Sequence, residues 1–526
     1  MRSPRLRRWS ESLPDPLPLP PGPLSNGEFV PAPAGPADVD LRRAIEAATS
    51  ESARRVGIDR RRFLRSAAGI ATALGAYELA ACSPGRRRGG TVAPPPSSSS
   101  SSSASPSTTA APGGTYALPP TTDVAACEHA LASRGEFIFD VHTHHVMPDG
   151  PWRRNAPATV RLVEGMLPYG CRAADPLTCV DRASYLHDLF LTSDTDVAML
   201  TDVPSSGEPD APIPFTSARG TQDAMALLAP GGVPRVLLQK VIAPNVGPLA
   251  ACLDDMTAAA ASGALRALKV YTAWSPAGHG WSLLDPSIGL PVVQHAHDLG
   301  VRVLVAHKGL PLVNFDAAHN RPDDVVAVSR QFPDMQFVVF HAAWDPGHRE
   351  GPFDSRATIG IDTLLAALDR YQVPPDSNVW VDLGTVWRQV LTDPTQAAHV
   401  VGKLLQRVGS HRVLWGTDAI WYGSPQPQIA AFRAFQITPA FQERFGYPAL
   451  TDDVKRAVFG LNAAALFGVD PAAVRCGLSA DPLTSSQPLV QQLADVLPSP
   501  WQPRGPTTRA EVVAWLRSSP AAWRPA

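Results

Sequence analysis

The sequence predicts an α/β protein whose main domain is a (β/α)8 TIM barrel, and three observations support this. From residue 137 onward, eight short β-branched runs alternate with helical stretches over about 300 residues, and such barrels typically take about 250. No Gly-rich phosphate loop follows the first run, which disfavours the alternative of a doubly wound open sheet. Polar residues that can bind a metal follow several runs, as is typical of the carboxyl ends of barrel strands.

The expected strands are short apolar runs bounded by turn-forming residues. Their ranges are 137–143, 196–201, 235–242, 264–271, 301–306, 336–340, 378–383 and 412–417. Between them lie stretches whose apolar residues recur every three or four positions, which predicts amphipathic helices. Examples of these helices are 247–262, 291–299, 358–371 and 395–408.

The composition fits a large apolar core and argues against several classes of protein. Hydrophobic residues make up 44% of the 526 residues, and the formal net charge is −2 at pH 7. A nearly neutral chain gives no reason to expect nucleic acid or a polybasic contact with a membrane. The six cysteines contain no CxxC pair, which argues against zinc fingers and thioredoxin-like redox chemistry. No apolar run reaches the roughly 18 residues that a membrane-spanning helix requires.

The segment before the barrel has the features of an export signal. Residues 1–59 form a proline-rich extension that we expect to be disordered, and residues 60–82 are typical of a twin-arginine signal. Its motif DRRRFLR (59–65) precedes an Ala/Gly-rich stretch, which ends in LAAC, similar to a lipoprotein processing box. Cleavage before Cys82 would leave a lipidated cysteine. We therefore expect a protein exported by the twin-arginine route, either lipid-anchored at the outer face of the cytoplasmic membrane through Cys82 or periplasmic.

The boundaries of the other segments follow from composition. The 59 residues before the arginine motif are long for a signal, and two explanations stay open: translation begins further downstream, or the segment is a cytoplasmic leader. Residues 83–134 are Ser/Pro-rich and lack the apolar side chains that offset ordering entropy, so we expect a flexible linker. The barrel is assigned to 135–470. Residues 471–526 form a C-terminal helical extension, in which Thr508 and Glu511 predict a capping box.

Polar residues end several of the predicted strands. In the first strand, period-two alternation places Asp140, His142 and His144 on one face, with Ile138 behind them. The later inward rows end in the same way: Val301, Val303 and Val305 before His307, Phe337 and Val339 before His341, Leu414 and Gly416 before Asp418, and Lys269 with Tyr271 at the end of the fourth strand.

The convergence of these residues indicates a metal site. A single histidine at a strand end is more often a structural hydrogen-bonding residue than a ligand. Here an HxH pair, two further histidines and an aspartate are expected at one barrel mouth. Nitrogen and oxygen donors gathered in this way suit a divalent metal with an open coordination position.

The motifs at these strand ends resemble the amidohydrolase superfamily of metal-dependent TIM-barrel enzymes. The resemblance is to its amidohydrolase-related branch, which includes the aminocarboxymuconate-semialdehyde decarboxylase type. It extends from about residue 137 to residue 470 and implies a small-molecule substrate. The segments that carry it are FDVHTHH (139–145), LKVYTAW (268–274), VAHKG (305–309), VFHAAWDPG (339–347), LWGTDAIWYGSP (414–425) and RAVFGLNAAALFGVD (456–470).

The resemblance implies roles for five residues. His142, His144 and Asp418 would ligate a divalent metal, and His307 would complete the site. His341 would bind a second metal, or polarise the substrate and move protons. Asp418 can also act as a general base, so Asp418, His341 and His307 are the candidate catalytic residues. The donor set suits zinc best, and manganese or iron would also fit.

Other residues near the mouth have open roles. In binuclear members of the superfamily a lysine at the end of strand four is carboxylated and bridges two metals, which Lys269 could do. Its alternative role is a charged lysine that binds a substrate carboxylate. Alternation directs His145 away from the metal, and Asp382 is a candidate to hold a ligand in place. Trp421 and Tyr422 are candidates to contact an aromatic acid.

Three functions are compatible with these observations. The first is a metal-dependent hydrolase that uses metal-activated water on an amide, ester or lactone-like bond. The second is a metal-dependent non-oxidative decarboxylase of an unsaturated or aromatic carboxylic acid, favoured by an uncarboxylated Lys269 and one metal. The third, a non-catalytic surface-anchored binding lipoprotein, is disfavoured by the intact ligand set. The sequence does not determine the substrate, the number of metals or the oligomeric state.

The cysteines fit an exported protein. Without Cys82 five remain, and Cys171 lies close to Cys179 in the long segment after the first strand. In an oxidising compartment these two are expected to form a local disulfide. Cys252 lies in a predicted helix and is expected to be a core residue.

Overall fold

The barrel strands form one parallel sheet in sequence order. The computed structural model describes residues 17–21, 36–81, 112–132, 135–165, 173, 175–229, 232–311, 315–478 and 481–496. The sheet has eight strands in the order β2 to β9, and each pairs in parallel with its neighbours. Their bounds are β2 (Phe139–Thr143), β3 (Val197–Leu200), β4 (Val236–Ile242), β5 (Leu265–Val270), β6 (Val303–His307), β7 (Gln336–Phe340), β8 (Val379–Asp382) and β9 (Val413–Leu414).

Contacts between the first and last of these strands close the sheet. The backbone N–H of Val141 donates to the carbonyl of Trp415 at 3.0 Å, and Thr143 bridges Ala419 in parallel. Each of the eight predicted runs coincides with one observed strand. The predicted (β/α)8 barrel is therefore confirmed.

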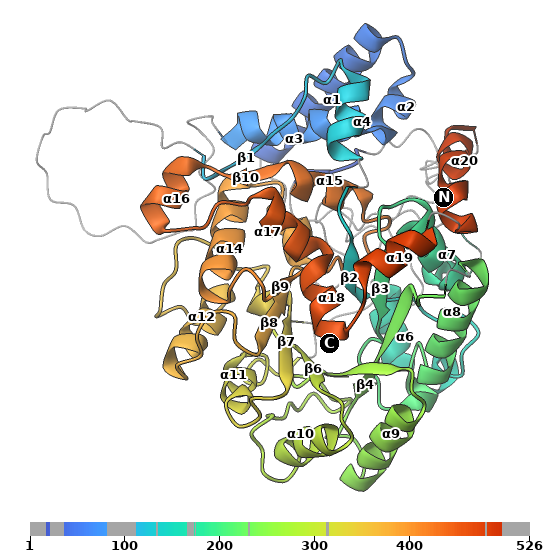
Figure 1. Cartoon of the computed structure of the whole chain (residues 1–526), viewed down its shortest axis with the longest axis vertical. Helices are drawn as coiled ribbons and strands as arrows, with labels where there is room; N and C mark the ends of the chain where they lie inside the picture. The colour runs from blue at the N-terminus through green and yellow to red at the C-terminus, as the bar shows by residue number, and fades with distance from the viewer. Residues whose placement is uncertain are drawn as a thin grey trace, which may run out of the picture.

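Helices cover the outside of the barrel, as Figure 1 shows. In α12, the side chains of Ile361, Leu364, Leu365 and Leu368 recur with helical spacing and are buried. The helices that follow the strands are α5 (Trp152–Asn155), α6 (Pro157–Gly165), α7 (Arg182–Leu186), α8 (Phe215–Leu228), α9 (Leu249–Ala261), α10 (Gly289–Asp298), α11 (Asp323–Ser329), α12 (Ile361–Arg370), α13 (Val386–Val390), α14 (Pro394–Arg407) and α15 (Gln426–Ala434). The four helices predicted as examples correspond to α9, α10, α12 and α14.

The barrel interior is a separate apolar core to which every strand contributes. Helices α18 (Asn462–Phe467) and α19 (Pro471–Leu478) add side chains to the same core. The interior side chains from the strands are Phe139, Val141, Val197, Met199, Leu237, Ala267, Val303, Val305, Val338, Phe340, Trp380 and Leu414. The remaining C-terminal helices are α16 (Pro439–Phe445), α17 (Asp452–Arg456) and α20 (Pro482–Val496).

Two of the predicted inward rows are wrong. In β7, Phe337 and Val339 pack in the outer core, whereas Val338 and Phe340 face the interior. In the first strand, Ile138 packs outward, because the pairing of β2 with β3 shifts register between Asp140 and Thr143. The alternation of inward and outward side chains is interrupted by a bulge and by the turn that follows a strand.

The region before the barrel is more ordered than expected. Residues 36–56, inside the extension expected to be disordered, form helix α1 (Pro36–Val56), so this part of the prediction is wrong. Leu41, Ile45 and Ala53 are buried on one face of α1, which packs against α3. Few large apolar residues mark this face, and the helical pattern is therefore weak in the sequence.

The signal-like segment and part of the expected linker also pack on the barrel. Helix α3 contacts α4, α14 and α15, and β1 pairs antiparallel with β10. These helices gather at one end of the molecule, next to α15 (Figure 1). The expectation of a flexible linker is therefore wrong for β1 and α4. The bounds are α2 (Arg60–Arg65), α3 (Ala67–Ala81), β1 (Gly114–Tyr116), α4 (Val124–Leu131) and β10 (Phe435–Ile437).

Several sequence predictions fall on residues outside the described ranges. They concern Cys82, Cys171 and the capping box at Thr508. Cys179 is disulfide-bonded, whereas Cys252 has a free thiol and is half-buried. The predicted pairing of Cys179 with Cys171 stays a prediction.

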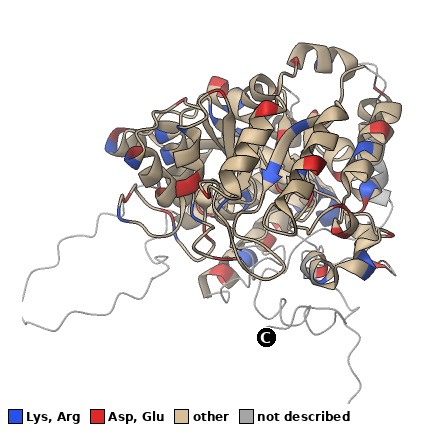
Figure 2. Cartoon of the chain, turned by 90° about the horizontal axis from the view of Figure 1, so that it is seen from below, with Lys and Arg blue, Asp and Glu red and all other residues tan. Residues whose placement is uncertain are grey.

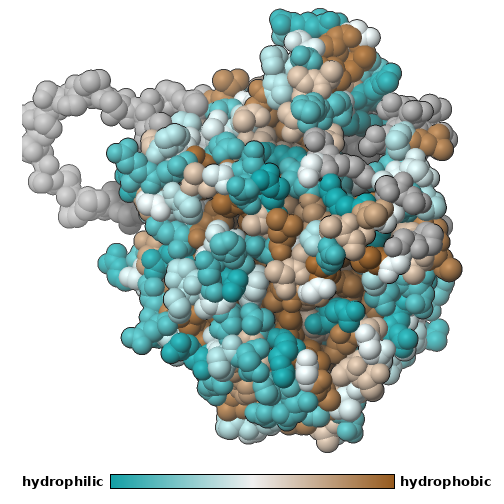
Figure 3. Space-filling model, in the orientation of Figure 1, coloured by the Kyte–Doolittle hydropathy of each residue, from teal (hydrophilic) through white to brown (hydrophobic). Residues whose placement is uncertain are grey.

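The described helices include no single helix that is long and apolar enough to cross a membrane. Two consecutive segments, Asp452–Phe467 and Pro471–Leu478, are together long and apolar enough to cross a membrane, judged by length and composition only. A bend of 110° separates them. Phe459, Ala463 and Val474 of this pair are buried in the protein core. On the faces drawn, charges of both signs are interspersed (Figure 2), and hydrophobic areas are broken by hydrophilic residues (Figure 3).

A buried ion cluster joins the segment after β7 to α14. The ammonium of Lys403 lies 2.6 Å from a carboxylate oxygen of Glu350 and 2.6 Å from one of Asp362, and all three side chains are buried. Glu350 also accepts the backbone N–H of Ile361, at the start of α12. The cluster therefore connects α12, α14 and the segment between β7 and α12.

We expect Lys403→Met to lower the free energy of unfolding by about 3–5 kcal/mol, because it leaves two carboxylates buried without a cation. Equilibrium urea unfolding measures this. The matched control is Arg356→Met, which removes a pair whose arginine side chain is 89% exposed and should change stability by less than about 0.5 kcal/mol. A loss below about 1 kcal/mol for Lys403→Met would contradict the role given to the cluster.

Candidate active site

Donor atoms from three strand ends meet at one point of the barrel mouth. His142, His341 and Asp418 each offer a ligand atom, and these atoms all lie within 4.8 Å of one another. Asp418 Oδ1 lies 3.5 Å from His142 Nε2 and 3.3 Å from His144 Nε2. All four side chains are buried. The structure therefore brings together four of the residues predicted to bind metal.

The other ring nitrogen of each of these histidines is held by a hydrogen-bond acceptor. His144 Nδ1 lies 2.9 Å from the carbonyl of Thr201, and His341 Nδ1 lies 2.9 Å from the carbonyl of Gly384. Because a carbonyl only accepts, both Nδ1 atoms carry the proton and both Nε2 atoms present a lone pair. His142 Nδ1 makes the equivalent contact with Asp382 Oδ2, at 2.9 Å.

This arrangement fits a divalent cation. Burial lowers the pKa of His142 well below its usual value, and it also lowers that of His144. Burial lowers the pKa of His341 to about 4, so these imidazoles are neutral near pH 7. The Nε2 lone pairs of His142 and His144 then face the Asp418 carboxylate across 3.5 and 3.3 Å. Acceptors placed this close need a cation between them, and an N/O donor set of this kind suits zinc and similar metals.

Asp418 is held from its other side by a hydroxyl. Thr385 Oγ1 donates to Asp418 Oδ2 at 2.7 Å, and the hydroxyl of Tyr422 lies 3.3 Å from Thr385 Oγ1. Burial acts to raise the pKa of Asp418, but His144, His341 and the Thr385 hydroxyl hold it below its usual range. Asp418 is therefore a carboxylate whose two oxygens have different partners.

Left-handed backbone conformations place these groups. The φ angles of His341, Thr385 and Asp418 are 62°, 59° and 60°. Non-glycine residues rarely adopt this region, and they concentrate at functional sites. At His341 the turn brings the ring to the mouth although Val339, which precedes it by two residues, faces outward.

His307 lies next to these four residues but outside their closest group. Its ring centroid is 4.5 Å from that of His341, and its Nε2 lies 3.2 Å from the carbonyl of Leu310. Its Nδ1 is buried and has no hydrogen-bond partner within the described part of the chain. Since Nε2 carries the proton, Nδ1 presents an unused lone pair.

Lys269 is buried beside the same donor atoms. Its Nζ lies 3.4 Å from His142 Nε2 and 4.7 Å from the ring centroids of both Tyr271 and Phe340. Phe340 also stacks on His142, with ring centroids 3.9 Å apart. The lysine is thus positioned by two aromatic rings at the metal site.

Two glycines make room for the contact between His142 and Asp382. A Cβ at Gly384 would lie 2.6 Å from both Asp382 Oδ2 and His142 Nδ1. A Cβ at Gly416 would lie 2.5 Å from Asp382 Oδ2. Real Cβ atoms do not approach other atoms so closely, so any larger residue here would displace the carboxylate or the imidazole.

The remaining predicted residues lie around this centre. His145 points away from it and lies 2.9 Å from the hydroxyl of Thr221 through Nε2, as alternation predicts. Trp421 approaches His144 with ring centroids 5.7 Å apart. The roles of Thr385 and Phe340 at the site were not predicted from the sequence, nor was the orientation of the histidines by backbone carbonyls. A hydroxyl directly after a strand end was the only available signal for Thr385.

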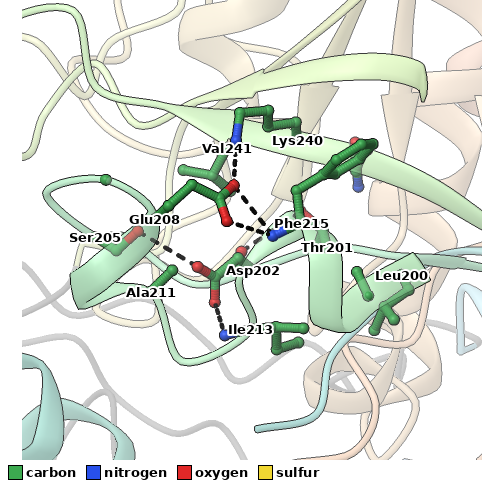
Figure 4. A pocket seen from close by; sticks show the side chains of 13 residues that line it. Leu200, Thr201, Asp202, Ser205, Glu208, Ala211, Ile213, Phe215, Lys240 and Val241 are labelled. Atoms are coloured by element: carbon green, nitrogen blue, oxygen red, sulfur yellow. Dashed lines mark hydrogen bonds and ion pairs between the residues drawn. The ribbon is translucent and has the colours of Figure 1, made fainter. Parts of the chain in front are cut away.

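A cavity lies between β3, β4 and α8, and Thr201, Asp202, Glu208 and Lys240 are among the residues that line it (Figure 4). Its charged groups are already paired: Glu208 with the ammonium of Lys240, and Asp202 with the backbone N–H of Ile213 at 3.1 Å. The cavity and the metal site share Thr201, whose side chain lines the cavity and whose carbonyl accepts from His144. One residue of the cavity wall, Thr201, therefore orients the candidate metal ligand His144 through its carbonyl. The charged side chains of the wall named above have partners of their own.

A family model described as Amidohydrolase matches residues 139–469, whereas no curated protein matches the chain. Among solved structures, 5-carboxyvanillate decarboxylase from Sphingomonas paucimobilis is 15% identical and covers 64% of this chain and 100% of its own, with a TM-score of 0.39. The corresponding enzyme from Novosphingobium aromaticivorans, complexed with manganese, is 14% identical. It covers 64% of this chain and 97% of its own, with a TM-score of 0.40. 2,6-Dihydroxybenzoate decarboxylase from Rhizobium is 12% identical and covers 64% of this chain and 99% of its own, with a TM-score of 0.36.

We expect Asp382→Asn to weaken metal binding about 10- to 100-fold, because it removes the carboxylate that orients His142. Competition with a chelator of known affinity, followed by elemental analysis, measures this. Asp376→Asn serves as the control, since Asp376 pairs with His411, and the side chains of the pair are 45% and 69% exposed. Equal affinity in the parent and Asp382→Asn would show that His142 is oriented without this contact.

Proposed function

The chain belongs to the amidohydrolase family, and from this premise we propose that it is a metal-dependent non-oxidative decarboxylase of an aromatic or unsaturated carboxylic acid. The observation that carries the proposal is the surroundings of Lys269. Its Nζ lies 4.7 Å from the ring centroids of Tyr271 and Phe340. Aromatic faces attract a cation and repel an anion, so this position favours an ammonium over a carbamate.

An uncarboxylated Lys269 argues against the hypothesis of a binuclear hydrolase. A carbamate there would carry a negative charge between two ring faces and would be needed to bridge a second metal. The ammonium instead provides a binding partner for the carboxylate of a substrate. This distinction between one metal with a charged lysine and two metals with a modified lysine is what separates the two enzyme hypotheses.

The residues that would hold the metal are His142, His144, His341 and Asp418. Zinc is the proposed ion, since the donors are three imidazoles and a carboxylate, and manganese or iron would also be accepted. When bound, the metal would act as a Lewis acid that polarises a substrate oxygen.

The side chains can then share the work of decarboxylation. Lys269 pairs with the substrate carboxylate and holds it beside the metal-site donors, since its Nζ lies 3.4 Å from His142 Nε2. The bond between the carboxyl carbon and its neighbour breaks, its electron pair stays on the substrate carbon, and CO2 leaves. The substrate carbon takes up a proton in exchange. His307 Nδ1, buried without a partner among the described residues, is placed to carry that proton.

We also propose export by the twin-arginine route with a lipid anchor at Cys82, supported by the arginine motif and the apolar α3. Processing before Cys82 would remove α1 to α3, whose side chains share a core with the barrel. Mass analysis of the chain from its native membrane fraction tests this. A lipidated N-terminus at Cys82 would agree with the proposal, and a chain that retains residues 36–81 would contradict it.

We expect Lys269→Met to lower kcat/KM for CO2 release at least about 30-fold, corresponding to a lost charge-assisted contact of about 2 kcal/mol or more. Rates are measured as CO2 release from a panel of hydroxybenzoic and unsaturated acids. The control is Lys240→Met, which removes another buried lysine that faces Glu208 and α8. Hydrolysis of lactones or esters without CO2 release in the parent would overturn the proposal.

We further expect one metal ion per chain, and none in His142→Ala/His144→Ala, because the double variant removes two of the four donors. Elemental analysis of both proteins, together with the intact mass of Lys269-containing peptides, gives the result. Two metals per chain and a carboxylated Lys269 would support the binuclear hydrolase instead.

A further inference from the structure

The two residues that follow β3 hold two groups of the candidate site through their backbone carbonyls. β3 ends at Leu200, and the carbonyl of the next residue, Thr201, lies 2.9 Å from His144 Nδ1. The carbonyl of Asp202 accepts from the hydroxyl of Tyr271 at 3.3 Å. This dipeptide therefore contacts both a candidate metal ligand and the aromatic residue that directly follows β5.

Tyr271 in turn lies against two residues that the proposed mechanism uses. Its ring centroid is 4.7 Å from Lys269 Nζ and 5.0 Å from the ring centroid of His307. A buried tyrosine hydroxyl usually has a hydrogen-bond partner, and that bond fixes the orientation of the ring. The position of the Asp202 carbonyl therefore determines how the Tyr271 ring meets the ammonium of Lys269.

The side chain of Asp202 ties the dipeptide to the loop between β3 and α8 (Figure 4). Its Oδ1 accepts the backbone N–H of Ile213 at 3.1 Å, and its Oδ2 accepts from the hydroxyl of Ser205 at 3.3 Å. The side chain is buried. Because β3 ends at Leu200, Asp202 lies beyond the sheet, and these two bonds fix the backbone there.

The carboxyl of Asp202 forms hydrogen bonds rather than an ion pair. The cation that lines the same cavity, Lys240, pairs instead with Glu208 and Asp255. Burying a carboxyl is unfavourable unless its hydrogen bonds are satisfied. The two bonds to the loop are therefore what offsets the burial of Asp202.

We propose that Asp202 is a positioning residue of the candidate site. Its carboxyl fixes the dipeptide, and the Thr201 carbonyl then orients His144 for the metal. The Asp202 carbonyl orients Tyr271 against Lys269. The part that concerns Lys269 rests on the proposed function, whereas the part that concerns His144 requires only a metal site. A change that frees the dipeptide therefore weakens metal binding and acid binding together.

The affinity for zinc, measured by competition with a chelator of known affinity, tests the first part. We expect Asp202→Ala to bind zinc about 10- to 100-fold more weakly than the parent, as when a residue that orients a ligand is lost. Asp202→Asn keeps an oxygen for the N–H of Ile213 and gains an amide that donates to Ser205, so its affinity should stay within about threefold of the parent. Parent-like affinity in Asp202→Ala, or an Asp202→Asn as weak as Asp202→Ala, would overturn the proposal.

Two control variants separate positioning from a general loss of stability. Asp188→Ala removes another buried carboxyl, which contacts His187. Glu208→Ala removes the second carboxylate that holds the same loop, at the N–H of Phe215. Both should bind zinc within about threefold of the parent, since neither holds the dipeptide. A loss in either control as large as that in Asp202→Ala would show that stability or loop order is responsible, against the proposal.

Acid binding tests the second part with a variant that leaves the loop intact. Protein saturated with zinc is titrated calorimetrically with benzoate. We expect Tyr271→Phe to bind benzoate about fivefold more weakly, as for one lost hydrogen bond, and to keep the zinc affinity of the parent. In Asp202→Ala/Tyr271→Phe the loss of benzoate affinity should equal that of Asp202→Ala alone, because both changes act through the same bond. Additive losses, or parent-like benzoate binding by Tyr271→Phe, would overturn this part.

The failure of this proposal can be told apart from the failure of the proposed function. Zinc binding that depends on Asp202, in a protein that releases CO2 from no acid, would keep the positioning role and remove the decarboxylase. CO2 release by a protein whose zinc and benzoate affinities do not depend on Asp202 would keep the decarboxylase and overturn the positioning role. A parent that binds zinc but not benzoate would overturn the part that concerns Lys269.

Discussion

The carboxylate of Asp382 is the contact on which the candidate site depends. Asp382 is the last residue of β8. Its Oδ2 lies 2.9 Å from His142 Nδ1, and its Oδ1 accepts the backbone N–H of His341 at 2.6 Å. One buried side chain therefore sets the ring of a residue on β2 and the backbone turn after β7. Burial raises the pKa of Asp382 well above its usual value, and the N–H of His341 and the ammonium of Lys269 act in the opposite direction. Gly384 and Gly416 leave the space in which this carboxylate lies.

The electrostatics of the mouth follow from this arrangement. Neutral imidazoles present lone pairs toward one carboxylate, Asp418, and a buried ammonium, that of Lys269, lies beside them. The centre is thus suited to a small cation, and the rings of Tyr271 and Phe340 beside it hold the ammonium of Lys269. The negative and the positive groups of the mouth therefore lie side by side, with Asp418 on one side of His142 Nε2 and Lys269 on another.

The fold and most of the candidate ligands could be predicted because they depend on local patterns. β-Branched runs mark every strand, and a polar residue at or directly after a strand end marks a candidate ligand, as at His142, His144 and Asp418. His341 was predicted correctly to lie at the mouth, but the predicted inward row that led to it is wrong. Its placement depends on a left-handed turn, which period-two alternation does not predict. The carbonyls of Thr201 and Gly384 could not be predicted, since any residue supplies a carbonyl. Helix α1 was missed because its buried face has only two large apolar residues, Leu41 and Ile45.

The closure of the barrel has a consequence for the order of folding. Asp140 accepts the backbone N–H of Thr417, 277 residues further along the chain, in the same two segments that supply His142, His144 and Asp418. Contacts of such long sequence separation form late, because the intervening chain must be ordered first. A partly assembled barrel that lacks its last strand therefore has no complete coordination sphere. Retention of a tightly bound metal would report that synthesis and folding have both reached the end of the barrel.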